Sequence, residues 1–365
     1  MKIPEEIPLE KKQAKQIRIA IIEGYTAHAR SFPWKETQDP YKIWLSEIIL
    51  QQTRTEQGLP YYLKITQKYP DIPSLAKAKE EPFLKDWEGL GYYSRARNML
   101  AAARYMMEHH QGTFPNTYEE ILALKGVGPY TAAAIASFAF GLRYPVVDGN
   151  VLRLFSRLFG ITAPVDVAST VRAIRHIACT LMDDKTDPAI FNQAIMDLGA
   201  SVCTPKQPKC SICPVRKYCR AYRDQLIDLL PVKSKTLKKK SLYYNYFYIP
   251  GHSGTFALTQ RDSTAFWKKM YQFPLLEDNG KYSTISYLQK RISKEWNYLP
   301  NHLQPIAEEK QTLSHRHIHA RLFVLDNFPP QNWQDNWLHT SVDDLTRLPL
   351  PKLMKTLIGR HLQIP

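Results

Sequence analysis

The stretch LKGVGPYTA, residues 124–132, sets two glycines directly before a proline and a run of small residues. Gly126 and Gly128 allow a tight turn, and Pro129 suits the first turn of a helix, where no backbone N–H donor is needed. Free N–H groups at such a helix start can hold a DNA phosphate without reading the base sequence. We therefore predict two helices joined by a tight hairpin, although a plain helix–turn–helix connection without a ligand would have the same pattern.

The segments on both sides of this hairpin have the apolar spacing of helices. Between about residues 10 and 225 the apolar residues recur at helical intervals, as in 101–107, 132–140 and 151–159. Strand-like runs do not alternate with these helices, which disfavours a parallel-sheet enzyme. We predict an all-α domain over residues 1–225.

The pattern changes after residue 231. A basic run follows that should be solvated, and we place a linker at residues 226–242. Strand candidates at 255–258 and 320–325 predict an α+β domain over residues 243–365. A chain of 365 residues is long enough to form two such domains.

The composition favours a nucleic-acid partner. Lys and Arg number 49 against 34 Asp and Glu, which gives a net charge of +15. The amino terminus lacks the basic start and apolar run of a signal peptide, and no stretch approaches the length of a membrane span. We expect a cytoplasmic, nucleoid-associated protein with no membrane partner, and a monomer because no coiled-coil pattern is present.

Four of the five cysteines lie close together, at Cys203, Cys210, Cys213 and Cys219. Their spacing, C-x6-C-x2-C-x5-C, allows four thiolates to converge on one metal centre, either tetrahedral zinc or an iron–sulfur cubane. This density indicates metal binding in a reducing compartment more than disulfide pairing. The fifth cysteine, Cys179, lies in an apolar stretch and is predicted to be a buried packing residue.

Two acidic residues lie where an acid suggests chemistry. On a helix, Glu47 shares a face with Ile43 and Leu50 and interrupts an apolar stripe. A desolvated glutamate has a raised pKa and can stay protonated near neutrality, as a general acid requires. Asp148 directly precedes a predicted helix in the string YPVVDGNV, residues 144–151. The alternatives are a boundary glutamate that reaches water and a simple N-cap aspartate.

The hairpin, the VDGN string about twenty residues further on and the cysteine spacing together resemble the helix-hairpin-helix DNA glycosylases related to endonuclease III, and among them the MutY family of adenine DNA glycosylases. The resemblance implies an all-α helix-hairpin-helix glycosylase domain with a 4Fe-4S cluster loop at 203–219, followed by an α+β Nudix-like domain. It also implies the partner, which is double-stranded DNA with adenine opposite 8-oxoguanine or guanine, and it makes Asp148 the catalytic aspartate.

Adenine excision requires the base to leave neutral while positive charge develops on the sugar, and two separated carboxyl groups can do this work. We predict that Glu47 protonates adenine at N7 and that Asp148 stabilises the oxocarbenium-like sugar until water completes hydrolysis. The resemblance places Tyr130 and Asn150 near the reacting sugar. It assigns contacts with the adenine or the DNA to Arg30, Trp34, Gln51, Gln52, Thr53, Leu90, Tyr92, Gly126, Gly128, Gln193 and Ser314.

Two features refine the predicted activity. Family members with strand-cleaving lyase activity carry a lysine where this chain has Tyr130, and that lysine forms a Schiff base with the sugar. Some adenine glycosylases carry a lysine where this chain has Leu152. We therefore expect a monofunctional glycosylase with negligible lyase activity.

The carboxy-terminal half resembles the Nudix-like domain of the MutY family in the string FWKKMYQFP, residues 266–274. Ser314 matches the position that senses 8-oxoguanine, with Leu313 in place of the usual phenylalanine before it. The helix around residues 288–295 is basic and lacks the acidic R-E-x-x-E-E pattern that binds magnesium in Nudix hydrolases. We predict recognition without hydrolysis.

Other functions fit parts of the sequence. An endonuclease III-like enzyme acting on oxidised pyrimidines would share the hairpin and the cysteines, but Tyr130 and the second domain disfavour it. A noncatalytic DNA-binding or redox-sensing cluster protein would keep the cysteines and the basic charge, but would need neither Glu47 nor Asp148. The missing acidic helix disfavours a phosphohydrolase.

Overall fold

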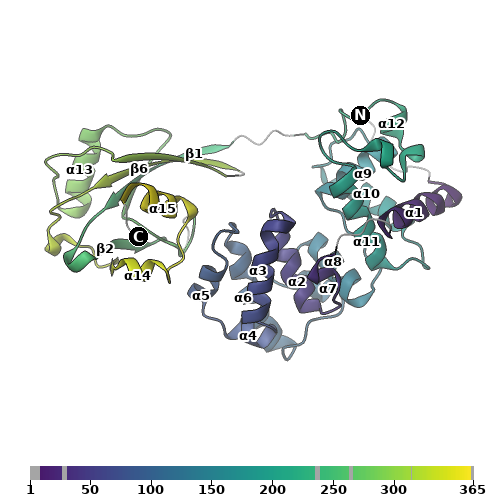
Figure 1. Cartoon of the computed structure of the whole chain (residues 1–365), viewed down its shortest axis with the longest axis horizontal. Coiled ribbons are helices and arrows are strands. Elements are labelled where there is room, and N and C mark those ends of the chain that lie inside the picture. The colour runs from purple at the N-terminus through teal and green to yellow at the C-terminus, as the bar shows by residue number, and fades with distance from the viewer. Residues whose placement is uncertain (1–8, 27–30, 235–238, 263–265, 314, 363–365) are drawn as a thin grey trace. The chain divides into compact units, whose positions relative to one another are not determined.

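The structure of the chain, a computed structural model, describes residues 9–26, 31–234, 239–262, 266–313 and 315–362. The chain forms two compact units, one of helices and one built on two β-sheets (Figure 1). The first unit comprises residues 1–77 and 98–236, and the second comprises residues 78–97 and 237–365. The second unit therefore includes a segment that lies within the helical part of the sequence.

In its described residues the first unit contains helices and no strand, as predicted. Its helices are α1 (Lys11–Thr26), α2 (Pro40–Leu50), α3 (Thr55–Lys68), α4 (Ile72–Lys77), α6 (Ser94–His109, which begins in the second unit), α7 (Tyr118–Ala123), α8 (Pro129–Phe140), α9 (Gly149–Phe159), α10 (Ala168–Leu181), α11 (Pro188–Asp197) and α12 (Arg220–Arg223). Short 3-10 helices lie at Pro33–Lys35, Cys210–Ile212 and Arg216–Tyr218, and a π-helical turn lies at Leu198–Val202.

Helix α2 is buried on all sides and packs against α3 and α8. The Asp39 side chain caps its first turn by accepting a hydrogen bond from the Tyr41 backbone N at 2.9 Å, and Pro40 occupies the first helical position. Every residue from Ile43 to Ile49 is buried. Glu47 is therefore enclosed by the core, and the alternative of a boundary glutamate reaching water does not hold.

The predicted hairpin connects α7 to α8. Gly126 has a φ of +84°, and a Cβ added there would lie 2.7 Å from the Cβ of Asn98. Gly128, the residue before Pro129, has a φ of −102° and nothing within 4 Å of an added Cβ. The turn thus requires glycine at the first of these two positions, by both conformation and space.

The second unit contains two sheets, with strand order β4-β1-β6-β5 in one and β3-β2-β7 in the other. Strands β1 and β6 are parallel and the other pairs are antiparallel. The strands are β1 (Lys240–Tyr248), β2 (Phe256–Gln260), β3 (Tyr271–Gln272), β4 (Leu275–Asp278), β5 (Ala307–Thr312), β6 (Arg316–Val324) and β7 (Trp337–Thr340). The helices are α5 (Glu80–Asp86), α13 (Ile285–Trp296), α14 (Val342–Leu345) and α15 (Lys352–Leu357), with short helical turns at His252–Gly254, Pro330–Asn332 and Ile358–Leu362.

Helices cover both faces of the four-stranded sheet. On one face Leu288 and Ile292 of α13 pack in a cluster with Phe323 of β6. On the other face Met354 of α15 packs in a cluster with Leu322 of β6. This is the predicted α+β domain. Successive side chains of a strand point to opposite faces of the sheet, so neighbouring residues such as Leu322 and Phe323 pack against helices on opposite sides.

Cys179 does not have the predicted burial, because it is exposed on α10. The buried stripe of α10 includes Ile174, Ile177, Ala178 and Leu181. Cys179 follows Ala178 by about 100° of helical turn, which carries it off this stripe. The apolar neighbours in the sequence belong to the buried face and Cys179 does not.

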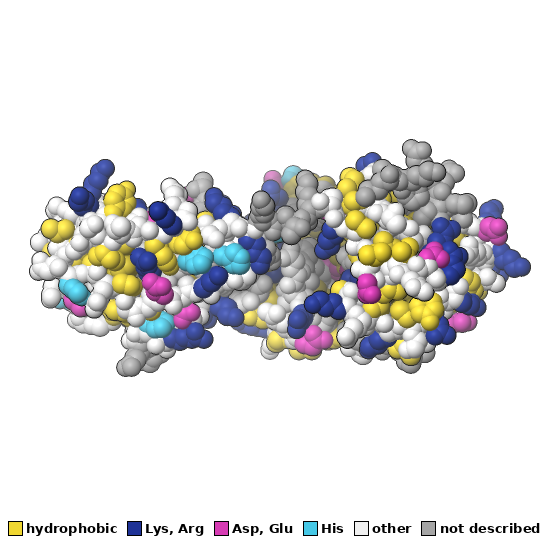
Figure 2. All heavy atoms as spheres, turned by 90° about the horizontal axis from the view of Figure 1, so that it is seen from above, with side chains coloured by type: hydrophobic (Ala, Val, Ile, Leu, Met, Phe, Trp, Pro, Cys, Tyr) yellow, Lys and Arg dark blue, Asp and Glu magenta, His cyan; other side chains and the backbone are white. Residues whose placement is uncertain are grey.

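Two features bear on the environment of the chain. Lys and Arg side chains outnumber Asp and Glu side chains on the face drawn in Figure 2, in keeping with the net charge of +15. None of the helices in the described part of the chain is both long and apolar enough to cross a membrane.

The two glycines of the hairpin should respond differently to substitution. We expect Gly126→Ala to destabilise the helical unit by about 1–3 kcal/mol, because it adds positive-φ strain and a close contact with Asn98. The matched change Gly128→Ala should cause a smaller loss, since its conformation and surroundings admit a methyl group. Thermal unfolding followed by circular dichroism measures both. Equal losses would contradict this description of the turn.

Candidate active site

Three ionisable side chains from three helices meet in the first unit. Glu47 lies on α2, Tyr130 lies in the first turn of α8, and Asp148 is the N-cap of α9. The Tyr130 hydroxyl donates to Met196 Sδ at 4.0 Å and interacts with the Glu47 carboxyl, and the Asp148 charge acts on both Glu47 and Tyr130. The hairpin and the VDGN string therefore bring their polar residues to the buried acid of α2.

The environment of Glu47 favours its protonated form. The residue is 8% exposed. The pKa of Glu47 is raised to about 7, chiefly by burial and also by the Asp148 charge, while the hydrogen bond from Tyr130 opposes the shift. Burial, with the charges of Glu47 and Asp148, also holds the pKa of Tyr130 well above its usual range, so this phenol remains a donor. A carboxyl with such a pKa can deliver a proton at neutral pH.

Asp148 is held by hydrogen bonds. Its Oδ1 accepts from the backbone N atoms of Asn150 at 2.9 Å and Val151 at 2.8 Å, and its Oδ2 accepts from Asn150 Nδ2 at 2.8 Å. Burial raises the pKa of Asp148, while these bonds and the nearby Arg153 charge oppose that shift. Asp148 is thus the N-cap of α9, and its fixed carboxylate also faces the site, so the two interpretations of this residue are compatible.

A recess that is open to solvent lies beside Glu47. Trp34 lines it and stacks on Phe32 with ring centroids 5.0 Å apart. The amide oxygen of Gln193 accepts a hydrogen bond from the Tyr25 hydroxyl. The lining residues are Phe32, Trp34, Lys35, Ile43, Ser46, Glu47, Leu50, Thr55, Phe138, Gln193, Met196 and Asp197.

Several residues of this recess are not predicted from the sequence, most notably the ion pair of Lys35 and Asp197. Their Nζ and Oδ2 atoms lie 2.7 Å apart, and both side chains are mostly buried. Asp197 follows Gln193 by one helical turn on α11, so helical spacing from Gln193 was a usable signal. In the sequence, Phe138 and Met196 look like ordinary core residues, and no sequence pattern distinguishes them from their apolar neighbours.

The remaining predicted residues are found in several places. Gln51 Nε2 donates to Thr131 Oγ1 at 3.3 Å, which ties the end of α2 to α8, and Thr53 follows in the turn after α2. Gln52 is exposed with a φ of +58°. Leu90 and Tyr92 belong to the second unit, where Leu90 is buried and Tyr92 is 42% exposed. Arg30 and Ser314 lie outside the described residues.

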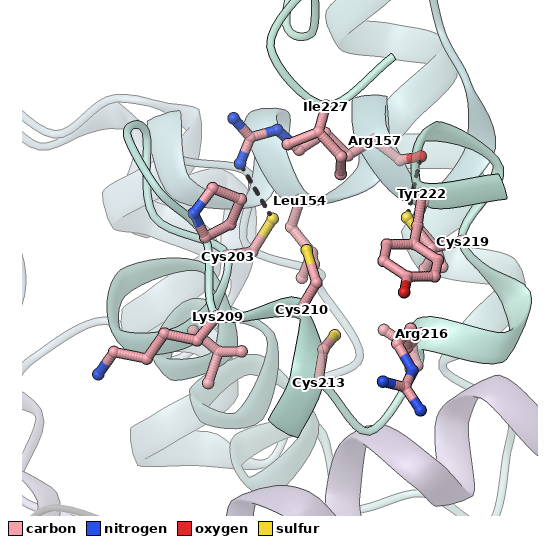
Figure 3. A pocket seen from close by; sticks show the side chains of 14 residues that line it. Leu154, Arg157, Cys203, Lys209, Cys210, Cys213, Arg216, Cys219, Tyr222 and Ile227 are labelled. Carbon is pink, nitrogen blue, oxygen red and sulfur yellow. Dashed lines mark hydrogen bonds between the residues drawn. The ribbon is translucent and has the colours of Figure 1, made fainter. Parts of the chain in front are cut away.

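The four clustered cysteines line one pocket together with Leu154 and Ile227 (Figure 3). Arg157 Nη1 donates to Cys203 Sγ at 3.5 Å. Burial raises the pKa of the Cys213 thiol to about 11. A bound cluster with positive iron would stabilise the thiolates, and the apolar wall would exclude water from them. The residues present therefore fit an iron–sulfur cluster.

One guanidinium connects this loop to Asp148. Arg153, 8% exposed, donates from Nη2 to Asn150 Oδ1 at 2.9 Å and to the Gly199 carbonyl at 2.6 Å, and from Nε to the Cys203 carbonyl at 2.7 Å. Asn150 in turn donates to Asp148. The position of Asp148 therefore depends on the backbone that leads into the first cysteine.

Comparisons with known proteins agree with this geometry. Residues 45–176 match the HhH-GPD superfamily of base excision DNA repair proteins, residues 203–219 match the iron–sulfur binding domain of endonuclease III, and residues 245–360 match the NUDIX domain. An adenine DNA glycosylase of Buchnera aphidicola from Acyrthosiphon pisum is 31% identical over 335 residues, which cover 91% of this chain and 94% of that protein. The relative from Schizaphis graminum is 34% identical over 274 residues, with 74% and 77% covered.

The chain belongs to the adenine DNA glycosylases.

Solved structures add the fold. A thermostable thymine-DNA glycosylase matches 58% of this chain and 98% of its own, with a TM-score of 0.55 and 32% identity. An endonuclease III–DNA complex matches 60% and 99%, with a TM-score of 0.50 and 23% identity, and shows the same helical fold. The described residues contain no group of three or more His, Cys, Asp or Glu arranged for one metal ion. The assignment of the cofactor comes from the family of the 203–219 loop.

These findings confirm four predictions about this adenine DNA glycosylase. It is a base-excision repair enzyme that hydrolyses N-glycosyl bonds, its helical domain has the helix-hairpin-helix fold, its cysteine loop carries a 4Fe-4S cluster, and its carboxy-terminal domain is Nudix-like. Of the two metal centres that the spacing allowed, the cubane is the one supported.

The buried acid should cost the fold stability as the pH rises. Below the unfolded pKa near 4.5, Glu47 is protonated in both states, so it has no effect. Between pH 4.5 and about 7 the unfolded chain loses this proton first, which removes about 3 kcal/mol of stability that stays lost at higher pH.

We therefore expect Glu47→Gln to match the wild type in stability near pH 4.5 and to exceed it at pH 8, since the amide stays neutral. Denaturant unfolding at the two pH values measures this difference, and Glu108→Gln, a change at an exposed site, is the control. A difference between variant and wild type that does not change with pH would contradict the raised pKa of Glu47.

Proposed function

We propose that this glycosylase removes adenine mispaired with 8-oxoguanine or guanine in double-stranded DNA. The observation that carries the proposal is a buried carboxyl with a pKa of about 7, beside a second carboxyl and at the wall of a recess that can take a purine. The relatives described above are adenine DNA glycosylases, which supports adenine as the excised base.

Each residue at the centre has a chemical role in this proposal. Glu47 protonates adenine at N7, so that the base leaves as a neutral species. Asp148, whose carboxylate accepts three hydrogen bonds, stabilises the positive charge that develops on the sugar. Tyr130 orients the Glu47 carboxyl, and Asn150 orients Asp148 through its amide. Water then completes hydrolysis.

The recess receives the adenine after it has left the duplex, which costs less when the base is mispaired. Trp34 offers an aromatic wall and Gln193 offers an amide that can bond to a base edge. Arg30 belongs to this set through the family resemblance. Lys35 and Asp197 add a fixed pair of opposite charges to the same wall.

The other assigned residues contact the DNA around the lesion. The turn with Gly126 and Gly128 holds a phosphate, and Ser314 reads 8-oxoguanine. Gln52 and Tyr92 enter the duplex on the opposite strand; both adopt a positive φ, at +58° and +46°, a strained conformation often kept at functional sites. Gln51, Thr53 and Leu90 support these contacts.

We also propose the division into a catalytic domain at 1–225, a linker at 226–242 and a recognition domain at 243–365. The enzyme acts as a monomer, because one lesion needs one active site.

A panel of duplexes tests the proposal. Under single-turnover conditions we expect cleavage of adenine opposite 8-oxoguanine and opposite guanine, seen only after alkali treatment, and no cleavage at thymine glycol. Glu47→Gln should bind the same duplexes with little change but lose at least about 100-fold in rate, since a positioned acid contributes about 10²–10⁴-fold. Alkali-independent cleavage at thymine glycol would assign the chain to the lyase branch instead.

Borohydride should trap no protein–DNA adduct during adenine excision. Among the described residues that line the recess, the only lysine amine is that of Lys35, and its Nζ is held in an ion pair 2.7 Å from Asp197 Oδ2. An endonuclease III-type lyase is the positive control for trapping. Efficient trapping by this enzyme would overturn the monofunctional assignment.

A further inference from the structure

Helix α5 is anchored on the carboxy-terminal part of the second unit. Lys85 Nζ donates to the carbonyl oxygens of Leu345 and Leu348, at 3.2 and 2.9 Å, just where α14 ends. A cation at a helix C-terminus satisfies carbonyl groups that have no partner within the helix. This contact joins residues that are far apart in the sequence, from the glycosylase part and the Nudix-like part.

Glu88, two residues beyond α5, is the centre of this contact. Its side chain is 10% exposed. Oε1 accepts a hydrogen bond from the Leu350 backbone N at 3.0 Å, and Oε2 pairs with Lys85 at 3.1 Å and with Lys355 of α15 at 2.6 Å. A mostly buried carboxylate with three donors fixes its neighbours, because losing it removes the ion pairs of Lys85 and Lys355 and takes this acceptor away from the Leu350 N–H.

Further contacts lie on both sides of Glu88. Before it, the Tyr271 hydroxyl bonds to Glu81 Oε2 at 3.2 Å. After it, Arg97 Nη1 donates to the Lys268 carbonyl at 3.1 Å. The segment from 80 to 97 is thus held at its beginning, middle and end by the residues that follow position 237.

The loop after Glu88 is compact and presents Tyr92. Gly91 and Tyr92 have φ values of +70° and +46°. Arg95 Nη2 donates to the carbonyl oxygens of Leu90 and Gly91, both at 3.1 Å, and Trp87 Nε1 donates to the Gly91 carbonyl at 3.2 Å. With its backbone tied inward, this loop leaves Tyr92 42% exposed.

We propose that Glu88 is a positioning residue that fixes the Tyr92 loop to the carboxy-terminal domain. The domain that reads the base opposite the adenine then also carries the aromatic side chain that enters the duplex, and the two act as one body. This inference rests on the proposed function of Tyr92 and of the recognition domain. The loop lies inside the sequence range of the glycosylase family, 45–176, yet packs with the Nudix-like unit.

If the Tyr92 loop moves with the recognition domain, the base opposite the adenine influences the rate of excision. Contact with 8-oxoguanine by the recognition domain places Tyr92 correctly only while Glu88 holds the loop. Glu88→Gln keeps the size of the side chain but removes both ion pairs. We expect it to lower the preference for adenine opposite 8-oxoguanine over adenine opposite guanine by about 3- to 30-fold, mostly by slowing excision opposite 8-oxoguanine.

Two measurements on the full-length, cluster-loaded enzyme test the inference. The first is hydrogen exchange of a peptide covering residues 84–97, in the wild type, in Glu88→Gln and in Lys355→Met, which removes one of the two cations from the exposed side. The second is the single-turnover excision rate on the two mispairs for the same proteins. Glu295→Gln, which removes an ion pair with Arg291 within α13, is the control.

Faster exchange at 84–97 in both variants, with a reduced preference and an unchanged control, supports the inference. The inference is overturned if the variants exchange at 84–97 at the wild-type rate. It is also overturned if exchange becomes faster while the preference for adenine opposite 8-oxoguanine is unchanged. If Glu88→Gln does not fold, Lys355→Met gives the same two readouts. A wild type without any preference for 8-oxoguanine would refute the proposed function, while the exchange data would still decide whether Glu88 anchors the loop.

Discussion

Burial of the Glu47 carboxyl constrains the rest of the helical domain. Helix α2 packs within the core and Glu47 is only 8% exposed, at the wall of the recess, so the charged form of this acid is disfavoured. The surrounding side chains do not remove the cost of charging Glu47. The hydrogen bond from Tyr130 reduces this cost in part, and the negative charge of Asp148 increases it. Burial raises the pKa of both carboxyl groups, but only Asp148 has three hydrogen bonds that oppose the shift, which suits the two groups to separate roles as acid and as stabilising anion.

Burial also acts on the second carboxylate, but its hydrogen bonds oppose the rise in its pKa. Asp148 accepts three bonds from the first turn of α9, and Arg153 extends this arrangement to the backbone at Gly199 and Cys203. Arg157 then bonds to the sulfur of Cys203. By stiffening the 203–219 loop, a bound cluster would fix the backbone that positions Asp148 through Arg153. It would take no part in breaking the N-glycosidic bond.

Much of this could be predicted from local sequence, because the relevant signals are short. The cysteine spacing, the glycine turn and the acid within an apolar stripe each act over fewer than twenty residues. Long-range pairings could not be read this way: the Lys35–Asp197 pair, the Arg153 bridge and the docking of Glu88 join residues separated by 46 to 267 positions. The predicted burial of Cys179 was wrong for a different reason, because apolar composition does not say which side of a helix a residue occupies.

The pH dependence of single-turnover adenine excision tests the central claim, that Glu47 carries a proton near neutrality. The account predicts a plateau below about pH 7, set by the pKa of Glu47, and a tenfold fall in rate for each pH unit above it. Residual activity of Glu47→Gln should not follow this curve. A wild-type rate that stays constant from pH 6 to 9, on the adenine–8-oxoguanine duplex, would contradict the assignment of Glu47 as the proton donor.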